Sequence, residues 1–180
     1  MNPLYLLTLA QALAACGSIT VVLLGGILGV KLATSPALAT LAPALAIVGM
    51  AGMTVPAALA MQRWGRRPVL IAAALFAAGA ACLAALGVAH ASFPLLCLGC
   101  LGVGMHNAFV QQYRFAAIEW VPPGDAGRAV STIMLGTLAA AFLSREAALA
   151  SENWWPGHVH AGSFLALAGL FVATAAVLLA

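Results

Sequence analysis

The stretch that decides the fold is rich in arginine, lies between two long apolar runs and reads Met61-Gln62-Arg63-Trp64-Gly65-Arg66-Arg67-Pro68. A lysine or arginine at the centre of a lipid-facing helix costs about 2.5 to 3.5 kcal/mol on insertion scales, so these arginines must lie outside the hydrocarbon of a bilayer. Gly65 permits a reversal of the chain, and Pro68 suits the first turn of a following helix. We therefore predict a short loop here that joins two membrane-spanning helices.

The composition supports the same conclusion. Hydrophobic residues make up 64% of the chain and charged residues 6%, whereas charged residues form about a quarter of an ordinary soluble domain. A membrane span needs about 20 residues, so 180 residues allow about six or seven crossings with short connections. No basic stripe with interleaved aromatic residues is present, which gives nucleic-acid binding almost no support. The composition predicts an all-α integral membrane protein.

Apolar runs follow one another along the whole chain, and we predict that they form one transmembrane domain of six spans over residues 1–180. All Asp, Glu, Lys and Arg residues fall outside these runs, as expected for segments that lie in lipid. The predicted spans cover about residues 4–30, 38–61, 69–89, 94–113, 129–143 and 161–180.

The basic residues are divided unequally between alternate connections. Five arginines lie in the second and fourth connections, whereas only Lys31 and Arg145 lie in the others. Because cytoplasmic loops carry an excess of Lys and Arg, we predict that the N-terminus and the second and fourth connections are cytoplasmic. The five residues are Arg63, Arg66, Arg67, Arg114 and Arg128.

The fourth run holds the densest set of polar side chains. At about 100° per residue, one helix face carries a polar stripe along most of the span, and His106 lies on nearly the opposite side. Polar groups are costly in hydrocarbon, so the stripe must face protein or a water-filled cavity. We interpret it as the lining of a substrate path, and a hydrogen-bonded seam between helices is the alternative. The predicted path residues are Gln11, Asn107, Gln111 and Arg114, and the stripe also contains Cys97, Cys100 and Gly104.

Two sharper hypotheses concern Cys97 and Cys100 in the same run. With methionines or a further cysteine they offer the soft ligands that bind Cu(I), and as a thiol pair they could exchange electrons with a quinone. Buried free cysteine more often serves as a small hydrophobic residue, so we predict neither a metal site nor a cofactor. The chain contains no phosphate-cradling loop, no Gly-x-Ser-x-Gly elbow and no His-Glu-x-x-His motif. We therefore predict no catalytic residues and a protein that is not an enzyme.

The arginine-rich stretch resembles a signature of the major facilitator superfamily. Arg63-x-Gly65-Arg66-Arg67 is similar to that family's loop between its second and third spans, and Gly127-Arg128-Ala129 is similar to its second basic loop. Gly102-x-Gly104 matches glycines of its fourth span, and the segment 107–117 resembles a proteobacterial branch with copper importers for cytochrome oxidase assembly and some riboflavin importers. Three positions depart from the family's usual acidic residue, glycine and arginine, namely Gln62, Ala58 and Leu98.

The resemblance implies a multi-pass secondary active transporter of the bacterial inner membrane for a small solute, with copper or riboflavin as the substrate class. Members have twelve spans in two halves, each half built of three-plus-three inverted repeats, and bind substrate between the halves. This chain resembles the first half alone, which implies a half-size or truncated chain that needs a second six-span half or a second copy. The resemblance assigns gating between states to Arg63, Gly65, Arg66, Arg67 and Arg128.

Two interpretations from other classes stay open. A non-transporting membrane assembly or interaction subunit would tolerate Asn107→Leu and Gln111→Leu, whereas a transporter would not. A membrane thiol or copper-binding protein would lose its function in Cys97→Ala or Cys100→Ala and would retain copper on purification.

Overall fold

The computed structural model describes residues 3–119 and 121–179, which form helices joined by short connections. Within these residues six helices are long and apolar enough to cross a membrane, and no strand is formed. The predicted all-α class is therefore confirmed. The elements are α1 (Pro3–Leu32), η1 (Pro36–Leu38), α2 (Leu41–Trp64), α3 (Arg66–Ala89), α4 (Phe93–Val110), α5 (Tyr113–Glu119), η2 (Pro123–Asp125), α6 (Ala126–Ala150) and α7 (Ala161–Leu179).

The arginine-rich stretch is mostly helix, and the prediction of a loop over residues 61–68 is wrong in that respect. Arg63 lies in the last turn of α2, Arg66 and Arg67 open α3, and Gly65 alone separates the two helices. Arginines are tolerated at the ends of membrane-spanning helices because their long side chains can extend to the interface. The chain reverses at Gly65, whose φ of 85° and ψ of 157° lie in a region open almost only to glycine.

Two further spans differ from the apolar runs. Helix α6 extends from Ala126 to Ala150, beyond the predicted 129–143, and most of the extension lies at its C-terminal end, where residues 144–150 are mainly good helix formers such as Ala, Leu, Glu and Arg. The fourth span is interrupted: α4 ends at Val110, a turn covers residues 111–112, and α5 begins at Tyr113. The polar stripe predicted on one helix is therefore divided between α4 and α5.

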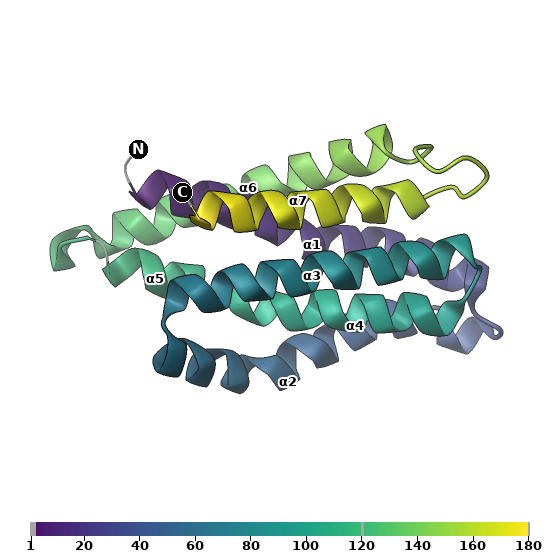
Figure 1. Ribbon diagram of the computed structural model, residues 1–180, viewed down its shortest axis with the longest axis horizontal. Coiled ribbons are helices and arrows are strands. Elements are labelled where there is room, and N and C mark those ends of the chain that lie inside the picture. The colour runs from purple at the N-terminus through teal and green to yellow at the C-terminus, as the bar shows by residue number, and fades with distance from the viewer. Residues whose placement is uncertain (1–2, 120, 180) are drawn as a thin grey trace.

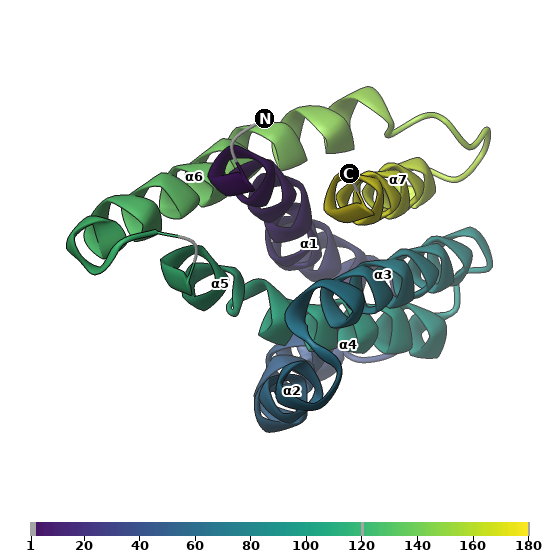
Figure 2. The same ribbon diagram turned by 60° about the vertical axis from the view of Figure 1, so that its left-hand side comes forward.

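Helices α1 and α4 lie at the centre of the bundle (Figure 2). Helix α2 packs mainly against α4, and α6 packs mainly against α1, while α3 and α7 pack against each other and against α4 and α1 respectively. The six long helices form two successive sets of three, α1–α2–α3 and α4–α6–α7. The middle helix of each set packs on the first helix of the other set. The first three and the last three long helices are therefore interleaved and do not form two separate packing units.

The backbones of the central helices approach their neighbours closely. A Cβ atom added to Gly104 of α4 would lie 2.1 Å from the carbonyl oxygen of Ala46 in α2. One added to Gly99 would lie 2.6 Å from the Cβ of Ala84 in α3. Helices in lipid associate through such packing, since no hydrophobic force drives them together. The contact of α2 with α4 therefore depends on a stripe of small buried residues, Ala42, Ala46, Gly49 and Ala57.

The two ends of the bundle differ in charge. The start of α1, the end of α7, the α2–α3 connection and α5 all lie at the left-hand end in Figure 1. This end carries five of the seven basic residues, and the opposite end carries Lys31 and Arg145. The two basic connections therefore share one side with the first and last turns of the bundle.

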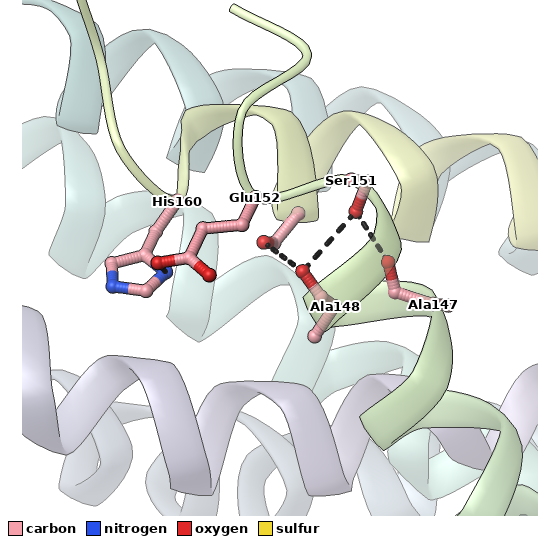
Figure 3. A network of polar contacts seen from close by, with 6 residues as sticks. Ala147, Ala148, Ser151, Glu152 and His160 are labelled. Carbon is pink, nitrogen blue, oxygen red and sulfur yellow. Dashed lines mark hydrogen bonds and ion pairs between the residues drawn. The ribbon is translucent and has the colours of Figure 1, made fainter.

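The α6–α7 connection closes the opposite end (Figure 3). Ser163 Oγ donates a hydrogen bond to the carbonyl oxygen of Ala148 at 2.8 Å, and the hydroxyl of buried Ser151 donates to the same oxygen at 3.5 Å. The His160 amide donates to the Glu152 carbonyl oxygen at 3.1 Å, and His160 Nδ1 lies 3.7 Å from Glu152 Oε1. These contacts hold the connection against the ends of both helices.

Candidate functional site

The side chains of the arginine-rich turn point to different partners. The Arg63 guanidinium lies 5.5 Å from the centre of the exposed Trp64 ring, a cation–π arrangement. Arg67 Nε donates to the Leu178 carbonyl oxygen at 2.6 Å, which joins the start of α3 to the end of α7. A cation near helix carbonyls at a C-terminus is favourable because it opposes the helix dipole. Two of the predicted gating arginines are thus engaged within this bundle.

A groove lies beside Arg66 at the same end. Its volume is about 310 Å³, and it is formed where the end of α2, the start of α3 and the turn after α4 meet. Three of its lining residues are polar and two are apolar. They are Gln62, Arg66, Gln112, Ala58 and Met61. Gln112, which lies in the turn at residues 111–112, shares this groove with Arg66.

Three other predicted residues lie at the surface of this end. Arg128 is exposed in the first turn of α6, away from the groove residues. Gln111 is also exposed, and its Oε1 accepts a hydrogen bond from Arg114 Nη2 across the break between α4 and α5. Gln111 and Arg114 are therefore paired with each other at the rim.

Gln11 lies inside the bundle on α1, with 6% of its surface exposed. Its Nε2 donates a hydrogen bond to Thr137 Oγ1 of α6 at 3.0 Å. The amide oxygen, Oε1, therefore points away from Thr137. Gln11 Oε1 is buried and has no hydrogen-bond partner among the described residues. The hydrogen bond from Nε2 holds the amide in place, and Oε1 has no partner among the described residues.

Asn107 lies inside the bundle on α4, with 8% of its surface exposed. Its Oδ1 is buried and, like Gln11 Oε1, lacks a hydrogen-bond partner in the described part of the chain. The residue belongs to the predicted polar stripe, whose members Cys97 and Cys100 are also buried. Gly104 interrupts the stripe, because at that position α4 rests on the backbone of Ala46.

Gln11 and Asn107 lie at nearly the same depth. Gly17 of α1 rests on α4, where an added Cβ would lie 3.0 Å from Cγ1 of Val103. Since α1 and α4 run in opposite directions, both polar residues lie on the arginine-rich side of this contact. At about 1.5 Å per helical residue, Gln11 is about 9 Å and Asn107 about 6 Å from it along the helices. The structure therefore places these two predicted path residues in one layer.

His106 occupies a different side of α4. It is 1% exposed, and its ring meets the ring of Phe171 in α7 edge to face, with 4.7 Å between the centroids. Its Nδ1 and the hydroxyl of buried Tyr113 also lack partners within the described residues. His106 thus contributes to the packing of α4 on α7, on the side away from the predicted stripe.

The cysteines are free thiols. Cys16, Cys97 and Cys100 are buried, and Cys82 is exposed on α3. Over residues 3–119 and 121–179, no group of three or more His, Cys, Asp or Glu side chains is arranged to hold a metal ion. Cys16 Sγ donates to the carbonyl oxygen of Ala12, as a small buried side chain in a helix commonly does.

Comparison with known proteins identifies one informative relative. The chain is 41% identical to a riboflavin transporter, RfnT, of Brucella anthropi over 165 residues. The match covers 92% of this chain and 42% of that protein, so the chain spans less than half the length of the curated relative it matches. No family model matches the chain, and no solved structure matches it. Together with the six apolar helices, the likeness places the chain among multi-pass membrane proteins.

Sequence patterns did not reveal two of the partners at the site. Thr137 of α6 binds Gln11, and Phe171 of α7 packs on His106, although each pair is far apart in the sequence. Neither residue stands out from its apolar run. Only the packing of α6 on α1 and of α7 on the central helices brings these residues to the site.

Proposed function

We propose that this chain is half of a riboflavin carrier of the major facilitator type. The observation that carries the proposal is the 41% identity with a riboflavin transporter over 92% of the chain. Buried amides on the two central helices support it, because carriers bind solutes near the middle of the membrane between helices. The chain carries no catalytic role in this proposal, and the energy comes from a coupled ion gradient.

A second six-span unit completes the carrier. The chain corresponds to 42% of its relative, which leaves room in that protein for another bundle of similar size. In the proposal, residues 1–180 act as one domain that rocks against a second six-span half or a second copy, with the solute between them. Gln11, Asn107, Gln111 and Arg114 line the path.

The arginine-rich end faces the cytoplasm in this proposal, as the excess of basic residues favours. The residues that control closure at that end are Arg63, Gly65, Arg66, Arg67 and Arg128. Single cysteines in a cysteine-free background test the orientation. A membrane-impermeant maleimide added to intact cells is expected to label Asn153→Cys and to spare Gly124→Cys, since both positions are exposed but lie at opposite ends. Labelling of Gly124→Cys alone would reverse the topology.

Uptake in a riboflavin auxotroph without its own importer tests the transport function. The chain is expressed alone and together with the part of the Brucella relative that it does not match. Isotopically labelled riboflavin is expected to accumulate well above the empty-vector level in at least one arrangement, and unlabelled riboflavin is expected to compete. Parallel copper uptake tests the other substrate class. Copper uptake without riboflavin uptake rejects the flavin assignment, and uptake of neither solute rejects the carrier.

A further inference from the structure

Two buried hydrogen-bond acceptors on the central helices have no partner among the described residues, and their chemistry indicates which part of a ligand they would bind. Gln11 Oε1 on α1 and Asn107 Oδ1 on α4 are buried without hydrogen-bond partners among the described residues. Their side chains are 6% and 8% exposed, and the two residues lie at nearly the same depth. An unpaired buried acceptor costs about 1 to 3 kcal/mol, so such a pair is rarely retained without use.

The two acceptors are positioned for a donor. The contact from Gln11 Nε2 to Thr137 Oγ1 at 3.0 Å fixes the amide plane, and the carbonyl end is thereby held away from α6. Neither residue has a cation or an N–H group of the described chain at its oxygen. A ligand group that donates hydrogen bonds would satisfy both atoms, whereas a ligand group that only accepts would leave both unpaired.

Riboflavin carries donors and acceptors on different parts of the molecule. Its tricyclic ring system has one donor, the N3–H between two carbonyl groups, and otherwise presents carbonyl oxygens and ring nitrogens, which accept hydrogen bonds. Two acceptors on separate helices need two donors, which is more than the ring supplies. Its sugar-alcohol side chain is a row of hydroxyl groups, each of which can donate. We infer that Gln11 and Asn107 bind the hydroxyl side chain and so distinguish riboflavin from flavins that lack it. The inference rests on the proposed function. It adds that the hydroxyl side chain, and not the ring system, lies beside Gln11 and Asn107.

A ligand pair tests the assignment directly. Lumiflavin has the same ring system with a methyl group in place of the hydroxyl side chain. Binding of both flavins to the purified assembly that supports uptake, in lipid nanodiscs, is measured by quenching of flavin fluorescence. The variants are Asn107→Leu and Gln11→Met, which keep side-chain size and remove the acceptor. Thr174→Val is the control, because this hydroxyl is fully buried on α7 and is already bonded to the Leu170 carbonyl oxygen.

Each acceptor variant is expected to weaken riboflavin binding about tenfold and to leave lumiflavin binding unchanged, as the loss of one buried hydrogen bond predicts. Thr174→Val is expected to bind both flavins as the unmodified chain does. An equal loss for both ligands, or none for riboflavin, overturns the assignment. Should Asn107→Leu lose a monodisperse profile, Gln11→Met carries the test alone. Failure of the unmodified assembly to bind either flavin rejects the proposed function instead.

Discussion

Helices α4 and α2 pack against each other but are buried to very different extents. Within its apolar window, 67% of the α4 span is buried, against 22% of the α2 span. Helix α4 meets α1, α2 and α3, whereas α2 buries a single stripe of small residues against α4. The remaining surface of α2 carries exposed aliphatic side chains, among them Ile47, Val48, Val55 and Leu59.

This difference teaches that apolarity does not separate the inside of a membrane bundle from its outside. Lipid is as apolar as a protein core, so a helix such as α2 can expose large aliphatic side chains without cost. Buried polar residues mark the inner helix instead, whereas close-packed glycines occur on both helices, as Gly104 of α4 and Gly49 of α2 show. Asn107 and Gly104 are both buried on α4, whereas Thr54 and Gly52 are exposed on α2.

The largest expected effect comes from a glycine-to-alanine substitution on α4, compared with the same substitution on α2. Gly104→Ala places a Cβ atom 2.1 Å from the Ala46 carbonyl oxygen, so we expect a loss of about 3 kcal/mol in the free energy of unfolding. Gly52→Ala meets no atom within 4 Å, and the better helix propensity of alanine is expected to add up to about 1 kcal/mol. Denaturant unfolding in mild detergent, followed by circular dichroism, measures both.

Equal effects of these two substitutions would contradict the contrast between the helices. A Gly52→Ala variant that is stable alone but fails to assemble with a second six-span unit would sharpen the contrast. It would identify the exposed face of α2 as a protein contact.

A smaller effect is expected at the end of α2. Gly65→Ala puts a side chain at a φ of 85° and a ψ of 157°, so we expect a loss of about 2 kcal/mol in unfolding free energy. Gly124→Ala is the control, because its φ is not positive and no atom lies within 4 Å of the added Cβ. The same unfolding measurement applies. Indistinguishable stabilities would show that the α2–α3 reversal does not depend on glycine.

The smallest effect is expected at Asn107, and it has the opposite sign. Asn107→Leu replaces a buried acceptor that has no partner in the described chain, so the unfolding free energy is expected to rise by about 1 kcal/mol. Thr54→Val on exposed α2 is expected to change it by less than about 0.5 kcal/mol. A large destabilisation by Asn107→Leu would mean that the amide serves folding rather than a ligand.

The predicted site residues separate into two groups when their positions are compared. Gln11 and Asn107 are both buried, and the sequence alone indicated that they face protein or water because polar groups are costly in hydrocarbon, but only the structure puts them at nearly the same depth. Gln111 and Arg114 lie at the rim, because the helix ends at Val110 and the regular stripe ends with it. Helical periodicity cannot foresee such a break, since nothing in the two glutamines forbids a longer helix.

The sequence by itself determined the class of the protein, the number of spans and the end at which its arginines gather. Those features follow from the cost of placing charge in hydrocarbon, which acts on each residue separately. The tertiary structure decided which helices are central, which amide atoms are left unpaired and which residues meet Arg66 in the groove. Those features depend on how helix backbones fit together, and that fit involves residues far apart in the chain.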